Sequence, residues 1–404
     1  MKYIVILGDG MAGWPIESLS GLTTIQAAKT PAMDKLAALG RSGVLHTVPA
    51  AYHPGSEVAN LAVLGYDLDL VFEGRGSLEA ASMGVEIKVG EMAMRCNLIT
   101  IDQEQKIKNH SAGHISSEDA KILIEYLQEQ LGGEAINFFS GVSYRHLFKL
   151  KGGRKELHCT PPHDVLGTPF KEVTIEATTS EAEPTAKLLN DLTLRSQELL
   201  AKHPLNLQRV AEGKDPANSI WLWSPGYKPA MQTLSEKYGL SSGSVISAVD
   251  LIKGIGVYAG LKVIEVEGAT GLYDTNYKGK TAAAIEALRN DDFVFLHIEA
   301  SDEAGHEGDP ELKIRTIEDL NNLVVAPIME AATTFDDQVT IALLPDHPTP
   351  CEIRTHTREA IPFVIYNPTL QGDNVTEYNE FAAKEGHFGE LRGEEFMKAL
   401  INTK

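Results

Sequence analysis

The sequence predicts an α/β fold in which helices flank a mostly parallel sheet, with an α+β domain inserted into it. The first observation is a set of short apolar runs typical of buried parallel strands, at Tyr3–Leu7, Phe293–Ile298 and Val339–Leu344. The second is that helical patterns lie next to these runs, and alternating strands and helices are typical of α/β domains. The third is a change of pattern in the middle of the chain.

Three segments between the predicted strands have helical patterns. Thr30-Pro31 opens the segment Ala32–Leu39, and proline near the first turn is a common helix start. Ala282–Arg289 precedes the second predicted strand, and Leu312–Ala332 precedes the third. We expect these helices to flank the sheet.

The middle of the chain looks like a separate α+β domain. Short alternating segments such as Ala93–Ile99 and Tyr144–Leu150 are separated by turn-rich stretches, and one long amphipathic helix follows at about Pro184–Ala201. A length of 404 residues also suggests two or three domains. We therefore expect one domain made of residues 1–80 and 217–404, and an inserted domain at residues 81–216.

Composition and charge exclude several classes of protein. A net charge of −20 makes nucleic acid and anionic membranes poor partners. No apolar run approaches the roughly 20 residues that cross a bilayer. The three cysteines are far apart, imply no disulfide framework and fit a reducing compartment, so we expect a cytoplasmic protein. An oligomer is compatible with the sequence but cannot be derived from it.

Acidic and histidine residues follow each of the three predicted strands. In open α/β sheets, functional groups gather just past the carboxyl ends of the strands. The residues at these positions, with one histidine that follows shortly after the third strand, are Asp9, Asp302, His306, Asp346, His347 and His356.

Carboxylate oxygens and imidazole nitrogens together suit Zn²⁺, Mn²⁺ or similar divalent ions. Asp302 and His306 are four residues apart and can face the same way on one helical turn. Six ligands are too many for one tetrahedral ion and enough for a two-metal site. The competing interpretation is that each Asp-His pair lies in an ordinary surface loop.

A candidate nucleophile lies in the segment Pro54-Gly55-Ser56-Glu57. Gly55 allows a tight turn and a close approach of a ligand to the backbone. Ser56 would then begin a helix, where free N–H groups favour a phosphate. A serine hydroxyl needs a base or a metal to become reactive. The alternative is that Ser56 is an ordinary helix N-cap, and on this segment alone that alternative is favoured.

The order of these residues resembles the cofactor-independent phosphoglycerate mutases of the alkaline phosphatase superfamily, and most closely their archaeal-type branch. Further stretches that look like that branch run through nearly the whole chain. They include Leu64–Asp67, Gly74–Gly76, Arg95–Asn97, Gly141–His146, Pro162–Asp164 and Asp302–Asp309.

The resemblance implies an alkaline-phosphatase-like fold and a role for each matching residue. Two divalent ions (Mn²⁺, Mg²⁺ or Zn²⁺) would be bound, one by Asp302, His306 and His356, the other by Asp9, Asp346 and His347 together with Ser56. Ser56 would carry the phosphoryl group while a small phosphorylated metabolite, 2- or 3-phosphoglycerate, is isomerised. Lys253 would correspond to the family lysine beside the phosphoryl group, with Lys280 as a weaker candidate. Substrate contacts are expected in the inserted domain, at His110, Arg145 and His163.

One departure from the branch leaves the substrate open. The segment Asn109–His114 stands where archaeal-type mutases commonly have an arginine, and arginine forks suit a small dianion. This feature is similar to a sub-branch proposed to act as homoserine kinase in threonine biosynthesis. We favour the mutase, with homoserine kinase as the alternative. Plain phosphatase activity is a third option, and a metal-stabilised scaffold without activity would be expected to lack some of these ligands.

Overall fold

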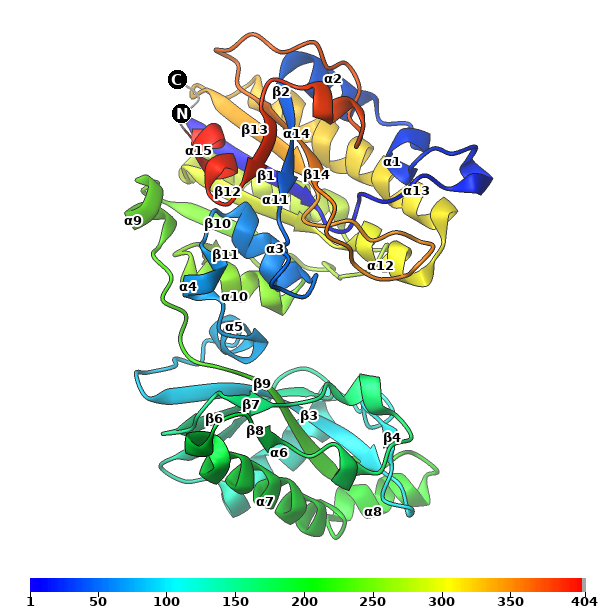
Figure 1. The fold of residues 1–404 in the computed structure, drawn as a ribbon, viewed down its shortest axis with the longest axis vertical. Helices are drawn as coiled ribbons and strands as arrows, with labels where there is room; N and C mark the ends of the chain where they lie inside the picture. Colours follow the sequence, from blue (N-terminus) through cyan, green and yellow to red (C-terminus); the bar gives the residue numbers. More distant parts are fainter. Residues whose placement is uncertain (402–404) are drawn as a thin grey trace. The chain divides into compact units, whose positions relative to one another are not determined.

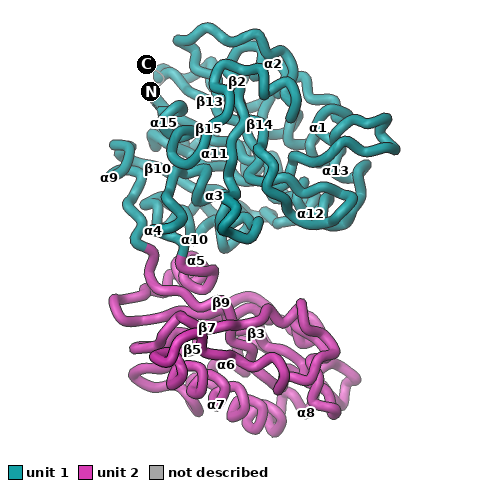
Figure 2. The backbone as a smooth tube through the Cα atoms, viewed as in Figure 1, with its two compact units in different colours: residues 1–72, 230–404 teal, residues 73–229 magenta. Residues whose placement is uncertain are grey.

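The computed structural model describes residues 1–401 and divides the chain into two compact units. Unit 1 comprises Met1–Phe72 together with the chain from Ala230 onward, and unit 2 comprises Glu73–Pro229 (Figure 2). The sequence placed the limits of the inserted domain at residues 81 and 216. Unit 2 begins before the first of these residues and ends after the second. The earlier start arises because α5 (Arg75–Ser82) packs on two strands of unit 2, a contact that local sequence does not reveal.

Unit 1 is built on an eight-stranded sheet. Its strands are β1 (Lys2–Gly8), β2 (Arg41–His46), β10 (Gly243–Ile246), β11 (Lys262–Val263), β12 (Phe293–Ile298), β13 (Val339–Leu344), β14 (Ile361–Tyr366) and β15 (Gly389–Arg392). They lie in the order β11-β10-β12-β1-β13-β14-β2-β15 (Figure 1). The neighbours from β11 to β13 are parallel, and β14 is antiparallel to both β13 and β2. The predicted mostly parallel sheet is confirmed.

The three central strands are the three that the apolar runs predicted. Every residue of β1, β12 and β13 is buried, as the near-continuous apolar sequences of strands covered on both faces require. Gly8 pairs with Ile298 of β12, and Leu7 pairs with Leu344 of β13. The carboxyl ends of the three strands are therefore level, and the loops that follow them start from one edge of the sheet.

Helices flank this sheet. They are α1 (Thr24–Ala27), α2 (Pro31–Leu39), α3 (Ser56–Val63), α4 (Leu68–Val71), α9 (Leu234–Tyr238), α10 (Asp250–Tyr258), α11 (Tyr277–Asn290), α12 (Ala300–Glu307), α13 (Pro310–Leu320), α14 (Ala326–Ala332) and α15 (Glu395–Ile401). Helix α2 packs on β14 and β2, and α11 packs on β10 and β12. None of the helices within residues 1–401 is long and apolar enough to span a membrane.

One predicted helix needs correction. The segment Leu312–Ala332 is not a single α-helix, because a π-helical turn at Asn321–Val325 separates α13 from α14. The Asn321 side chain accepts hydrogen bonds from the backbone N–H groups of Ala32 and Met33, at 2.9 and 3.1 Å. It thereby satisfies free donors at the start of α2. The irregular turn thus coincides with a contact to another helix, which the helical period of the segment cannot indicate.

Unit 2 has the α+β composition expected for the inserted region. Its main sheet contains β3 (Glu91–Ile101), β4 (Ile107–Asn109), β5 (Ile136–Phe139), β6 (Arg145–Lys151) and β9 (Ser219–Gly226), and a small second sheet pairs β7 (Leu157–His158) with β8 (Glu176–Ala177). The remaining helices of this unit are α6 (Ser117–Leu131), α7 (Glu183–Leu200) and α8 (Pro204–Ala211). Buried residues of β3, α6 and α7 form one apolar core, as the period of α7 predicts.

Candidate metal centre

The level ends of the three central strands bring the predicted acidic residues together. Asp9 follows β1 directly, and its N–H donates to the Ile298 carbonyl of β12 at 2.9 Å. Asp302 lies in the first turn of α12, and Asp346 follows β13 after one intervening residue. Gly10 has a φ of +60°, and a Cβ there would lie 2.4 Å from Asp302 Oδ1. Glycine is therefore needed for the β1 loop to pass this close to Asp302.

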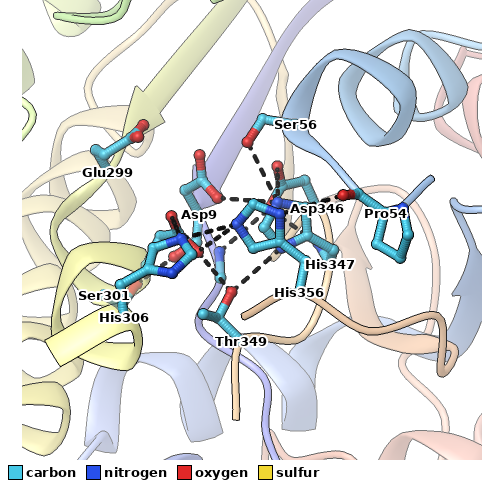
Figure 3. Close-up of polar contacts among 12 residues, drawn as sticks. Asp9, Pro54, Ser56, Glu299, Ser301, His306, Asp346, His347, Thr349 and His356 are labelled. Atoms are coloured by element: carbon cyan, nitrogen blue, oxygen red, sulfur yellow. Dashed lines mark hydrogen bonds and ion pairs between the residues drawn. The ribbon is translucent and has the colours of Figure 1, made fainter. Parts of the chain in front are cut away.

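Asp302, His306 and His356 form one group of possible ligands. His306 Nε2 lies 3.1 Å from Asp302 Oδ2, which agrees with the i, i+4 spacing on α12. His356 Nε2 lies 3.4 Å from Asp302 Oδ1 and 2.9 Å from His306 Nε2. The two imidazole nitrogens thus lie close to each other, as His306 and His356 in Figure 3 show, and close to the same carboxylate. This convergence is what three ligands of one cation require.

Asp9, Asp346 and His347 form a second group, and all three are fully buried. His347 Nε2 lies 3.6 Å from Asp9 Oδ1 and 3.4 Å from Asp346 Oδ2. Asp346 Oδ1 accepts from the N–H groups of Gly10 and His347, at 3.1 and 2.9 Å. Asp9 Oδ1, in contrast, has no hydrogen-bond partner within the part of the chain that the structure describes. A buried carboxylate oxygen without a partner is costly unless a proton or a cation meets it.

The charges of the site favour a cation. Burial, and then the neighbouring Asp346, raise the pKa of Asp9 well above its usual value. Asp302 differs: burial raises its pKa, but hydrogen bonds from His306 and His356 outweigh burial and hold it well below the usual value. The same contact with Asp302 raises the pKa of His306 to about 9. Carboxylates and imidazoles that compete for protons at one buried place are a donor set that fits divalent metal ions.

Ser56 is the first residue of α3 and is not an N-cap. Gly55 occupies the N-cap position, and no side chain caps this helix end. The Ser56 Oγ instead lies 3.2 Å from His347 Nε2 (Figure 3). Asn60, one turn further along α3, donates to Asp346 Oδ2 and to the Ser56 carbonyl, each at 2.9 Å. The capping alternative is therefore wrong, and α3 directs the Ser56 hydroxyl into the second ligand group.

Two residues beside Asp9 were missed by sequence reasoning. His297, within β12, has its Nε2 2.9 Å from Asp9 Oδ2 and its Nδ1 3.1 Å from the Ser247 hydroxyl. Glu299 follows β12, and burial raises its pKa to about 8. With Asp9 they form a further group of possible ligand atoms. His297 could have been found from the sequence, because it is a polar residue within an otherwise apolar buried strand. A buried polar side chain of this kind needs a hydrogen-bond partner.

The two candidate lysines have different surroundings. Lys253 on α10 forms an ion pair with Glu265, at 2.8 and 2.9 Å to its two carboxylate oxygens. Lys280 on α11 is fully buried, and its Nζ lies 3.4 Å from the Thr270 carbonyl. Burial lowers the pKa of Lys280 to about 8, while the nearby Glu299 acts to raise it. Lys280 thus has an electrostatic link to a neighbour of Asp9, whereas Lys253 has its own counter-ion.

The predicted substrate contacts lie in unit 2 around one tyrosine. The His110 ring is 5.7 Å from the Tyr144 ring and 6.1 Å from the His163 ring. The Arg145 guanidinium is 5.8 Å from the centre of the Tyr144 ring. Burial, followed by the neighbouring His163 and His114, lowers the pKa of His110. The structure thus gathers these three residues, and their contact with a substrate stays a prediction.

Comparison with known proteins finds phosphoglycerate mutases both among relatives in sequence and among solved structures of similar fold. Residues 37–206 match the family model of 2,3-bisphosphoglycerate-independent phosphoglycerate mutase. A mutase of that name from Methanosarcina mazei is 49% identical over the whole of both chains. A Pyrococcus horikoshii structure has a TM-score of 0.83 at 29% identity, covering 100% of this chain and 98% of its own. The cofactor-independent phosphoglycerate mutase of Thermoplasma acidophilum has a TM-score of 0.70 at 25% identity, covering 100% and 99%.

Metal binding should release protons and strengthen as the pH rises. In the metal-free chain the pKa of His306 is raised to about 9, so its imidazole holds a proton at neutral pH, and the pKa of Asp9 is raised, so its carboxyl keeps a proton to a higher pH than an ordinary aspartate. A divalent ion needs the carboxylate ionised and the imidazole neutral, so it displaces those protons. Calorimetric titration with Mn²⁺ between about pH 6 and about pH 9, in buffers of different ionisation enthalpy, measures both quantities. An affinity that stays constant or falls over this range would contradict the site as described.

Proposed function

The chain belongs to the 2,3-bisphosphoglycerate-independent phosphoglycerate mutases, and we propose that it interconverts 2-phosphoglycerate and 3-phosphoglycerate through a phosphoserine at Ser56. The observation that carries this proposal is the Ser56 hydroxyl, 3.2 Å from His347 Nε2 within a buried set of metal-ligand side chains. An ordinary serine hydroxyl is a weak nucleophile. At this place, neighbouring side chains can hold a cation beside the serine oxygen and so activate it. We expect its substrate to be a small phosphorylated metabolite, and the cytoplasm to be its compartment.

The ligand groups support two divalent ions. Asp302, His306 and His356 would hold one, and Asp9, Asp346 and His347 would hold the other. Bound there, the ions would lower the pKa of the serine hydroxyl and offset charge on the phosphoryl oxygens. The fit rests on the unpartnered Asp9 Oδ1 and on the facing nitrogens of His306 and His356.

The chain's own residues account for the two halves of the reaction. Ser56 loses its proton and its Oγ forms a bond to phosphorus, while the bond from phosphorus to one glycerate oxygen breaks and that oxygen gains a proton. The other glycerate hydroxyl then attacks the phosphoserine and returns Ser56 to its starting state. Asn60 keeps α3 fixed to Asp346, so the serine oxygen stays in place in both halves.

We assign unit 1 to catalysis and unit 2 to substrate recognition. All of the proposed ligands and Ser56 lie in unit 1, and His110, Arg145 and His163 lie in unit 2. Homoserine kinase would use the same serine and the same ligands, so the core does not distinguish the two activities. The mutase is favoured because the relatives from Methanosarcina mazei and Thermoplasma acidophilum are named phosphoglycerate mutases and match over their full length.

Replacing Ser56 with alanine should abolish turnover and leave metal binding intact. The loss in kcat should be at least about 10³-fold, because no other oxygen can form the covalent intermediate. Mn²⁺ stoichiometry is measured alongside the rate. Ser235→Ala, an exposed serine in α9, is the matched control and should behave as wild type. A Ser56→Ala enzyme with full activity would refute the mechanism.

Two matched substitutions can distinguish whether Lys280 or Lys253 contributes to catalysis. Lys280→Met should lower kcat by about 10²-fold, because it removes a buried positive charge linked to Glu299 beside Asp9. Lys253→Met removes a cation that is already paired with Glu265 and should have a smaller effect. Steady-state kinetics on both variants, with circular dichroism to check folding, decide the question. A larger loss in Lys253→Met would restore Lys253 as the family lysine.

The substrate is tested by offering the purified enzyme two reactions side by side. With 3-phosphoglycerate we expect rapid formation of 2-phosphoglycerate without added 2,3-bisphosphoglycerate. With homoserine and ATP we expect no O-phosphohomoserine. Both products are followed by phosphorus NMR in the same buffer and with the same metal. O-phosphohomoserine formation without mutase activity would replace the mutase by the kinase.

A further inference from the structure

Thr349 is the residue that contacts both ligand groups through one side-chain atom. It lies three residues after Asp346 and is fully buried. Its Oγ1 donates a hydrogen bond to Asp302 Oδ1. It also lies 3.3 Å from His347 Nδ1 (Figure 3). Asp302 belongs to the first group of ligands and His347 to the second, so this hydroxyl contacts a member of each.

The chemistry of the three partners fixes the direction of both hydrogen bonds. A carboxylate only accepts, so the hydroxyl proton of Thr349 goes to Asp302. The hydroxyl oxygen is then left with its lone pairs and accepts from His347 Nδ1–H. This arrangement selects one tautomer of His347, in which Nε2 carries a lone pair instead of a proton. Nε2 is the atom that faces Ser56, Asp9 and Asp346.

The backbone around Thr349 is held on both sides. Its carbonyl accepts from the Nζ of the buried Lys313 at 2.7 Å, and its N–H donates to the Ala12 carbonyl at 3.0 Å. The same Nζ of Lys313 donates to the Ala12 carbonyl at 3.0 Å. Lys313 thus ties the loop after β1 to the loop after β13. The Thr349 hydroxyl is aimed by a backbone that these contacts make rigid.

Two glycines pack closely against this threonine. A Cβ at Gly10 would lie 2.6 Å from Thr349 Oγ1, and a Cβ at Gly305 would lie 2.6 Å from the Thr349 carbonyl oxygen. Neither distance leaves room for a side chain. The close approach of the loop after β1 and of helix α12 restricts rotation of the Thr349 side chain.

We propose that Thr349 is a positioning residue that couples the two metal-ligand groups, by orienting Asp302 and by fixing the tautomer of His347. The inference rests on the proposed metal site but adds a residue and a consequence to it. When the hydroxyl is present, His347 is ready to bind a cation before the cation arrives. Without it, the Nδ1–H of His347 is left unpaired in a buried place, and the ring can bind protons on either nitrogen.

The test removes the hydroxyl without changing the shape. Thr349→Val should weaken Mn²⁺ binding by about 10- to 100-fold, the range seen when partners of metal ligands are lost. Thr349→Ser keeps a hydroxyl and should recover most of the affinity. Thr340→Val is the matched control, because Thr340 is a buried threonine of β13 whose hydroxyl has no hydrogen-bond partner within residues 1–401. Binding is measured by calorimetry on the full-length chain.

A second measurement observes the tautomer of His347 directly and does not depend on metal binding. Nitrogen-15 NMR of histidine-labelled, metal-free wild type, with His347 assigned from a His347→Gln spectrum, reports which ring nitrogen carries the proton. We expect the proton on Nδ1 in wild type and in Thr349→Ser, and a mixture of tautomers in Thr349→Val.

Three outcomes would overturn the proposal: a proton on Nε2 in the wild type, wild-type affinity in Thr349→Val, or equal losses in the valine and serine variants. Mutase activity decides a separate question. A wild type that binds Mn²⁺ and shows the expected tautomer, yet does not isomerise phosphoglycerate, would refute the proposed function and leave Thr349 in its role.

Discussion

The parallel alignment of β12, β1 and β13 is the constraint on which the rest of the molecule depends. The pairing of Gly8 with Ile298 and of Leu7 with Leu344 sets three strand ends at one level. Register in a buried sheet is strongly fixed, because a shift of one residue would turn every side chain to the opposite face. Each strand therefore delivers its acidic residue to the same place, and the site is determined by the same apolar packing that stabilises the sheet.

That alignment concentrates negative charge where water cannot screen it. Asp9, Asp302 and Asp346 are all buried, and the protein offsets their charges unequally. Asp346 receives backbone N–H groups and Asp302 receives histidines and Thr349, whereas Asp9 has His297 on one oxygen and no hydrogen bond within residues 1–401 on the other. A bound cation would compensate the negative charge that the protein leaves without a partner at Asp9. The fold thus brings together a buried set of carboxylates and imidazoles of the kind that suits a divalent cation.

The sequence could predict those features that are recorded in consecutive residues of one segment. The bounds of β12 and β13 were predicted correctly, since a buried strand is recorded in consecutive apolar residues. The candidate ligands could be proposed because they follow those strands. The contact of Ser56 with His347, the break at Asn321 and the contact of Thr349 with Asp302 were not accessible in the same way. Each depends on a partner in another segment, 291, 289 and 47 residues away respectively, which no period or spacing within the segment records.

In the proposed mechanism, discrimination between substrates would come from outside the metal centre, because a metal–serine core recognises a phosphoryl group and little else. In unit 2 the guanidinium of Arg95 is buried, and Arg75 and Arg145 are near enough that their charges help to lower its pKa. Glu79 pairs with Arg95 and compensates one of these three charges. A neutral His110 adds no further charge of its own. The excess of positive charge suits a substrate with a free carboxylate and no amine, which phosphoglycerate provides and zwitterionic homoserine does not.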